Sequence, residues 1–347
     1  MTIFCDAYLR KARHLLIPSL CALVMLYGVS KRAQAEPQEV EPGLTVDINP
    51  AIHGKIRVAE GIGMHYLPLT VIRDLHLLEK IYPNATVEWK TIFTTGQQRD
   101  AMLAGQLDFG TCTPEPYFQA LDKGVNWKIL QISSAFNSIL LVKPGGPRDV
   151  KDLIKSMIGT NKKISPGPNT VQYFATQKLL LDLGLSPHAL DRNWVRLPHA
   201  TATQALITGD LYAYFATGNF AVDLLEKGMQ RVSSLTEIYG QMHPVGVCAL
   251  NSTLQRMPKI SKGYANLIRV TIKWIKANPS RVDGMVRSDQ TIAGFPKYIA
   301  AKAIELRTTD ALYQYYGSVM AKIGAIKNAP ESSAVVYAYP SKAGPRW

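Results

Sequence analysis

The alternation of hydrophobic and polar positions predicts two kinds of element in the first half of the chain. Apolar residues at every second position favour a strand, as in ATVEWKTIF at 85–93. Apolar residues three and four positions apart favour a helix, as in LPLTVIRDLHLLEK at 67–80. The predicted strands are Lys55–Ala59, Ala85–Phe93 and Leu107–Gly110, and the predicted helices are Leu67–Lys80, Gln97–Ala104 and Pro116–Lys123. This β-α-β-α-β order is typical of a parallel sheet with crossover helices.

The second half repeats this order, and part of the sequence repeats with it. Residues 101–110 (AMLAGQLDFG) align with residues 205–214 (ALITGDLYAY) without a gap, and the same offset carries Thr113 onto Thr217. The predicted strands are Lys162–Ser165, Asn193–Leu197 and Leu211–Phe215, and the predicted helices are Val171–Leu183, Gln204–Thr208 and Phe220–Lys227. We interpret the repeat as one supersecondary unit used twice.

A long β-favouring stretch separates the two units. Lys128–Val142 carries polar residues in its middle and ends at a Pro/Gly-rich turn. A strand of this length could leave one sheet and enter another. Pro244–Leu250 (PVGVCAL) is predicted to return toward the first unit. Three later segments are predicted as outer helices, before a tail at 332–347: Tyr264–Ala277, Lys297–Ile304 and Leu312–Ile323.

The N-terminus has the pattern of a secretion signal. Three basic residues precede the apolar run Leu15–Val29, and Ala33-Gln34-Ala35 supplies the small residues that signal peptidase requires. The run is short for a membrane-spanning helix. Residues 1–35 are therefore predicted to be a signal peptide cut after Ala35, which directs the chain to the periplasm; an uncleaved anchor is the alternative.

Composition narrows the function classes. Removing residues 1–35 takes away five Lys/Arg and one Asp, so the net charge falls from +13 to +9, which favours anionic solutes. The basic residues are scattered, so nucleic acid is not expected as a partner. Only Cys112 and Cys248 then remain, without a metal-ligand spacing, so neither a metal nor a cofactor is predicted. The sequence does not decide whether these two cysteines form one disulfide or remain two thiols.

These elements and their turns resemble a known family from Lys55 to Ile304. The resemblance rests on four segments: Leu67-Pro68-Leu69, AMLAGQLDFG, Ile164–Gly167 and ALITGDLYAYF. The chain resembles the nitrate/sulfonate/taurine/pyrimidine-binding proteins of ABC importers. The resemblance implies an α/β fold, a two-lobed clamshell of the periplasmic-binding-protein type II. Each lobe would be a mainly parallel sheet flanked by helices, and Ile132–Leu141 and Pro244–Leu250 would be the two hinge strands.

The implied division places lobe one at 36–136 and 243–347, and lobe two at 137–242. The implied partners are a small-molecule solute and the membrane permease of the importer, and the protein is expected to be a monomer. In such sheets, ligands bind at the carboxyl ends of strands, where helix N-termini present free N–H groups. The candidate ligand-binding residues are Gly63, His65, Tyr66, Thr95, Gly96, Gln97, Thr111, Thr113, Phe136, Asn137, Gly167, Asn169, Thr170, Thr201, Thr217 and Asn219.

Alternative roles remain for these and for nearby charged residues. Thr, Asn and Gly at helix starts are also ordinary caps. Glu60 and Glu115 would suit a ligand ammonium group or surface salt bridges, and Arg99 and Arg196 would suit an anion. Which turn residues contact the ligand is left open.

The sequence favours a binding protein over an enzyme. We expect it to capture a small organic anion such as a sulfonate, taurine or nitrate. The alternative is a pyrimidine or aromatic carboxylate, because Tyr66, Phe93, Phe136, Tyr173 and Phe220 lie near the predicted cleft. A pyrimidine-precursor synthase is less favoured, since the related enzymes use a cysteine-rich iron motif that is missing here. Hydrolase signatures such as GxSxG and HExxH are also missing.

Overall fold

The computed structural model describes residues 36–92, 94–286, 293–307, 312–331 and 335–337. Its first sheet begins with β3 (Gly54–Glu60), parallel to β4 (Ala85–Thr91). β5 (Gly110–Cys112) follows, through a parallel bridge from Phe109 to Val58 in β3. β11 (His243–Leu250), β6 (Trp127–Phe136) and β12 (Ile304–Glu305) complete it with antiparallel pairings. The strand order is therefore β4-β3-β5-β11-β6-β12.

The second sheet has the order β8-β9-β7-β10. Its strands are β8 (Ile164–Ser165), β9 (Ala213–Thr217), β7 (Ser138–Val142) and β10 (Gln230–Ser234). Only β8 and β9 pair in parallel, and a bridge from Ile164 to Trp194 extends the β8 edge. In both sheets, a parallel set is followed by an antiparallel strand that arrives from the other sheet. The sheets are therefore mixed, and the prediction of a mainly parallel sheet in each lobe is wrong, because the strands that cross between the sheets pair in the antiparallel sense.

The sequence repeat corresponds to matching structural units. The first is α5 (Thr95–Leu103), β5 and α6 (Pro114–Asp122), and the second is α9 (His199–Thr208), β9 and α10 (Asn219–Glu226). The constant sequence offset carries Thr95, the first residue of α5, onto His199, the first residue of α9. The prediction of one unit used twice is confirmed.

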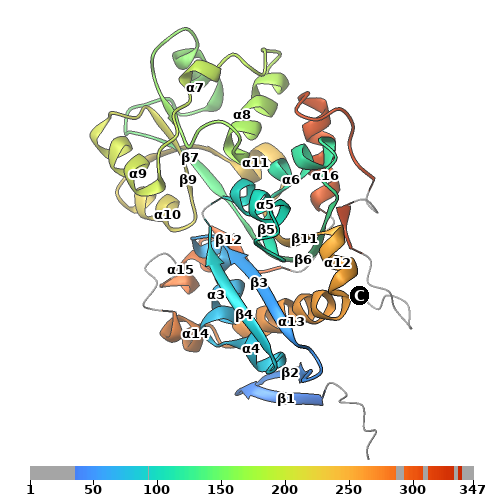
Figure 1. The fold of residues 1–347 in the computed structure, drawn as a ribbon. Coiled ribbons are helices and arrows are strands. Elements are labelled where there is room, and N and C mark those ends of the chain that lie inside the picture. Colours follow the sequence, from blue (N-terminus) through green and yellow to red (C-terminus); the bar gives the residue numbers. More distant parts are fainter. Residues whose placement is uncertain (1–35, 93, 287–292, 308–311, 332–334, 338–347) are drawn as a thin grey trace, which may run out of the picture.

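Two connections join the sheets, near the centre of Figure 1. β6 ends at Phe136 in the first sheet, and after Asn137 the chain continues as β7 in the second. The return runs from β10 through α11 (Leu235–Tyr239) to β11. The predicted change of sheet within Lys128–Val142 is confirmed, and so is the return strand.

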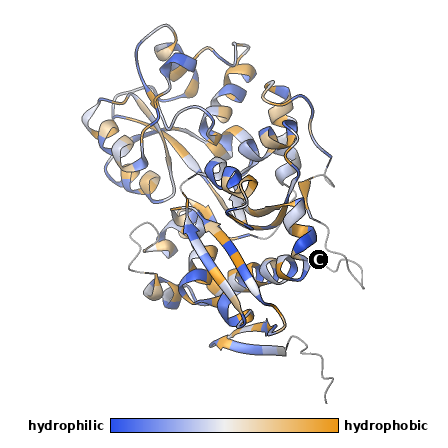
Figure 2. Cartoon of the chain, in the orientation of Figure 1, coloured by the Kyte–Doolittle hydropathy of each residue, from blue (hydrophilic) through white to orange (hydrophobic). Residues whose placement is uncertain are grey.

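Several flanking helices, including α3 (Leu67–Asp74), α7 (Val150–Met157) and α13 (Pro258–Ala277), are amphipathic, and their apolar faces close the core. The longest, α13, packs against β6 and α3 through buried residues such as Leu267 and Ile268. Figure 2 shows hydrophilic and hydrophobic residues interspersed along these outer helices. The other helices are η1 (Met64–Tyr66), α4 (Leu77–Ile81), α8 (Val171–Asp182), η2 (Asp191–Asn193), α12 (Asn251–Arg256), α14 (Pro279–Met285), α15 (Phe295–Ala300) and α16 (Leu312–Lys322).

Several predicted elements differ from the structure. The helix expected over 67–80 is divided because His76 has a φ of 51°, a left-handed value that ends α3 before α4 begins. The strand expected at 193–197 is reduced to the single bridge at Trp194. Residues 36–48 form a hairpin of β1 (Glu36–Glu41) and β2 (Leu44–Ile48), which the sequence pattern did not predict.

The predicted signal peptide, residues 1–35, lies outside the described residues. Within the described ranges, no helix combines the length and apolar character needed to cross a membrane. Cys112 and Cys248 are buried free thiols.

Candidate functional site

The turn after β3 depends on two glycines. A Cβ atom at Gly61 would lie 2.3 Å from the ring of Tyr66, and Gly63 has a φ of 118°. A Cβ atom at Gly63 would also lie 3.2 Å from the His65 ring. Only glycine leaves room here for both aromatic rings to fold back over the turn. The carboxyl end of β3 thereby presents His65, with Tyr66 buried beneath it.

His65 lies in an aromatic environment. Its ring centroid is 4.2 Å from that of Tyr66 and 4.9 Å from that of Phe136. Its backbone carbonyl accepts a hydrogen bond from the Ser134 hydroxyl. Burial, and then the neighbouring imidazoles of His199 and His243, lower the pKa of His65 to about 3. The ring is therefore neutral at physiological pH.

The second sheet presents a matching histidine. His199 begins α9, its Nδ1 hydrogen-bonds the Tyr214 hydroxyl, and its ring stacks on Phe220 with centroids 5.2 Å apart. Burial lowers the pKa of His199 as well. The two sheets meet here, since a Cβ atom at Gly218 would lie 3.9 Å from Met64 of η1. We call the set of Met64, His65, Phe136, His199, Gly218 and Phe220 the junction.

A buried polar cluster lies where β7 and β9 reach the crossing. The Ser138 and Thr217 hydroxyls are 2.6 Å apart. The Gln172 amide donates to both, at 3.0 and 3.2 Å. Asn137 occupies the crossing itself: its N–H donates to the Ala303 carbonyl, and its Oδ1 accepts from the Thr236 N–H. Thr217 and Asn137 thus hold the crossing together through their own side chains.

The remaining predicted residues lie at helix starts or in strand ends. Thr94, not Thr95, caps α5, and its hydroxyl accepts from the Gln97 N–H. Gly96 borders open space and Gln97 is exposed. Thr111 is buried, with its N–H and hydroxyl bonded to the Gln98 amide oxygen. Thr113 and Asn219 stand at the starts of α6 and α10, half-buried, and Thr201 is exposed in the first turn of α9.

Gly167, Asn169 and Thr170 form one turn before α8, where Thr170 donates to the Gly167 carbonyl and caps the helix. Their contacts are with one another and with Arg196, whose Cα would lie 3.1 Å from a Gly167 Cβ. The structure therefore groups the predicted residues into the junction, the crossing and separate helix starts.

All four charged candidates have protein partners. The Glu60 carboxylate pairs with Arg73 of α3, and the fully buried Glu115 lies 3.0 Å from His243 Nε2. Arg99 pairs with Asp100, and Arg196 donates to the Pro168 carbonyl. The acidic candidates are thus engaged within the protein.

Sequence reasoning missed His199. The repeat itself carried the signal, because the offset that aligns the two units places His199 at the position of Thr95, which was a candidate. The residue type changes between the units, so a search for hydroxyls and amides passed over it.

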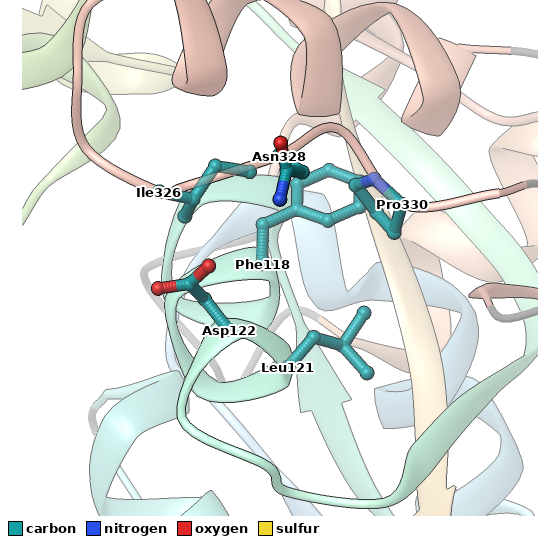
Figure 3. A pocket seen from close by; sticks show the side chains of 6 residues that line it. All are labelled: Phe118, Leu121, Asp122, Ile326, Asn328 and Pro330. Atoms are coloured by element: carbon teal, nitrogen blue, oxygen red, sulfur yellow. The ribbon is translucent and has the colours of Figure 1, made fainter.

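Two further observations concern other kinds of site. Among the residues that the structure describes, no three His, Cys, Asp or Glu side chains gather as a metal site requires. A cavity of about 210 Å³ lies at the C-terminal end of α6, away from Thr113 at the start of that helix (Figure 3). It is lined by Phe118, Leu121, Asp122, Ile326, Asn328 and Pro330. Its Asp122 carboxylate already accepts from the Lys327 N–H.

Lowering the pH from 7 to 5 is expected to destabilise the chain through His65. The unfolded imidazole has the ordinary pKa of 6.5 and the folded one a pKa of about 3, so between these values the unfolded state binds the extra proton. The free energy of unfolding then falls, with a slope approaching about 1.4 kcal/mol per pH unit below 6.5. Urea denaturation at both pH values measures this loss. His65→Gln should reduce it and His53→Gln, in an exposed loop, should not; equal losses in both variants would contradict the assignment.

The fold is similar to that of solved periplasmic binding proteins. The periplasmic aliphatic sulphonate binding protein SsuA of Escherichia coli matches with a TM-score of 0.64 at 14% identity, over 80% of this chain and 95% of that chain. The alkanesulfonate-binding protein SsuA of Xanthomonas axonopodis pv. citri, bound to MOPS, matches with a TM-score of 0.63 at 14% identity, over 81% and 96%. A Candida albicans gene product with the generic periplasmic binding protein fold matches with a TM-score of 0.61 at 11% identity, over 81% and 92%.

The chain therefore has the periplasmic-binding-protein fold, and the predicted resemblance is confirmed at that level. No protein-family model matches the sequence, and no curated protein matches it either.

Proposed function

We propose that this protein is the periplasmic solute-binding component of an ABC importer and that it captures a small organic anion between two lobes. The lobes are 36–136 with 243–347, and 137–242, in a type II clamshell whose hinges are the β6–β7 and α11–β11 crossings. The supporting observation is the meeting of the two sheets at the junction, in a fold shared with sulfonate-binding proteins. The protein acts as a monomer and delivers its solute to the membrane permease.

The chemistry around the junction suits an organic anion. Helix N-termini point free N–H groups at the carboxyl ends of strands, and each favours a negative charge by about 0.3–1 kcal/mol when exposed. The carboxylate of Glu60 pairs with Arg73, and that of Glu115 lies 3.0 Å from His243 Nε2, so both are already engaged within the protein. A sulfonate or carboxylate would therefore meet donors without an opposing free acid.

One observation favours the alternative, an aromatic solute. Aromatic rings lie on both sides of the junction: His65 with Phe136 on the first sheet, and His199 stacked on Phe220 on the second. Such faces hold planar ligands by stacking. A pyrimidine or an aromatic carboxylate would use this feature, whereas a small alkanesulfonate or nitrate would use it less.

Ligand-induced thermal stabilisation tests the proposal. The chain from Glu36 is screened with alkanesulfonates, taurine, nitrate, aromatic carboxylates and pyrimidines. A ligand at a hundred times its dissociation constant adds about 2.7 kcal/mol to the folded state. Stabilisation by alkanesulfonates, taurine or nitrate supports the proposal, stabilisation by pyrimidines or aromatic carboxylates alone supports the alternative, and no stabilisation by any class contradicts both.

Gly96→Leu is expected to weaken solute binding at least tenfold with little change in stability. A side chain at Gly96 meets no atom within 4 Å and would extend into the open space at the start of α5. Calorimetric titration with the best solute of the screen measures the effect. Gly284→Leu is the matched control, because that glycine also borders open space, in α14. Gly167 is a poorer test, since its φ of 110° strains any replacement.

Export through a signal peptide cut after Ala35 completes the proposal. N-terminal sequencing of the exported protein should read from Glu36, and a mature protein that begins at Met1 would overturn the export step.

A further inference from the structure

Two imidazoles from different sheets lie near each other at the junction with free ring nitrogens. In the described part of the chain, neither ring nitrogen of His65 has a hydrogen-bond partner, and His199 uses only Nδ1, toward Tyr214. The Nε2 of His199 therefore remains open. The two rings lie on the two sides of the contact between the sheets. Met64, next to His65, would lie 3.9 Å from a Cβ atom at Gly218, and Phe220, two residues after Gly218, stacks on His199.

The titratable groups around His65 leave its charge uncompensated. Tyr66 lies against it on the same turn, and burial raises the pKa of that phenol to about 12, so the phenol is neutral. The Phe136 ring contacts both His65 and His243 of β11, and His243 has its own partner, Glu115. Glu305 on β12, the strand packed against η1, pairs with Arg307. Glu60 at the end of β3 pairs with Arg73 of α3, the helix packed against η1. Among the described residues, a protonated His65 would thus have no carboxylate of its own.

The surroundings of His199 are similar. Tyr214 is its hydrogen-bond partner, and burial raises the pKa of that phenol well above its ordinary value. Asp223 on the neighbouring α10 accepts a hydrogen bond from Tyr298. Each imidazole therefore lacks an anionic partner within the part of the chain that the structure describes.

Resting on the proposed function, we propose that His65 and His199 form a two-sided clamp that selects an anionic solute and takes up a proton as the anion enters between them. The two residues are specificity-determining: the clamp favours a solute with a permanent negative charge over a neutral one of the same size. The solute supplies the carboxylate or sulfonate charge that the protein withholds from both rings.

Proton uptake follows from electrostatics. An opposite charge within about 4–6 Å raises the pKa of an imidazole by about 1–3 units. Binding of an anion that stays charged over the whole range therefore becomes tighter as the pH falls, because the complex holds more protons than the free protein. A neutral solute brings no such charge, and its affinity stays constant.

Calorimetric titration with butanesulfonate and with uracil at pH 7.5 and pH 5.0 tests the clamp. The dissociation constant for butanesulfonate is expected to fall about two- to tenfold at pH 5.0, with proton uptake visible as a buffer-dependent heat. Uracil, if bound, should show no change. His65→Gln and His199→Gln should each flatten the butanesulfonate profile, and His53→Gln, with its exposed ring, should keep it. Circular dichroism checks that both variants fold.

The outcomes separate the two proposals. Equal butanesulfonate affinity at both pH values, or a slope that survives in both glutamine variants, overturns the clamp while the binding function stands. Binding of uracil without binding of butanesulfonate at either pH overturns the organic-anion function and the clamp together. A tighter complex at pH 5.0 that depends on both histidines supports the clamp.

Discussion

Glu115→Ala is expected to lower the free energy of unfolding by about 3–5 kcal/mol. Glu115 and His243 are both fully buried, with 3.0 Å between the carboxylate and Nε2. Removing the carboxylate leaves His243 unpaired among aromatic rings, including that of Tyr316 with its centroid 4.7 Å away. An unpaired buried polar group costs far more than the pair itself contributes. Urea denaturation at pH 7 measures the change.

Two further variants make this result specific. Glu115→Leu combined with His243→Leu removes both partners, so it should recover much of the loss. Lys297→Ala removes one partner of an exposed ion pair with Glu226 and should leave the free energy of unfolding nearly unchanged. If Glu115→Ala lowers the free energy of unfolding by less than about 1 kcal/mol, the buried pair contributes little to the stability of the protein.

Gly61→Val is expected to cost about 1–3 kcal/mol of stability and to weaken solute binding at least tenfold. The new Cβ atom would stand 2.3 Å from the Tyr66 ring, which is 5% exposed and has little room to move. Displacing Tyr66 shifts the turn that presents His65, since the two rings lie 4.2 Å apart. Denaturation and calorimetric titration together measure both effects.

Gly284→Ala is the control for this variant, because a Cβ atom at that glycine in α14 meets nothing within 4 Å. A stable Gly61→Val protein with unchanged affinity would mean that the turn after β3 does not form the site. Tyr66→Ala is less informative about the ligand: it empties a buried position and would lower stability whatever the solute.

Much of the fold could be predicted from the sequence because helices and strands depend on local periodicity. The β-α-β-α-β order of the first unit, the matched offset of the repeat and the change of sheet within Lys128–Val142 all appear in the structure, whereas the middle strand of the second unit is only a bridge. The two failures have different causes, one in the backbone of a single residue and one in the position of a strand in its sheet. Nothing in the apolar pattern of 67–80 indicates the left-handed residue His76, and the edge position of Trp194 left it one bridge instead of a strand.

The site was only partly predictable. The rule that ligands bind at the carboxyl ends of strands located the turn with Gly63 and His65, and also Thr217 and Asn137 at the crossing. It did not identify His199, because one imidazole at a helix start has no distinctive local pattern. The acidic candidates Glu60 and Glu115 also looked free in the sequence, whereas folding gives each a buried partner.

By itself, the sequence determined the order of the elements, their repetition, and the positions of the glycine turns. The tertiary structure decided which residues meet: His65 with Phe136, Glu115 with His243, and Met64 with Gly218. The physical reason is the range of the forces involved. Periodicity and turn chemistry act over a few residues, whereas these meetings depend on strand order and on how closely the two sheets approach each other.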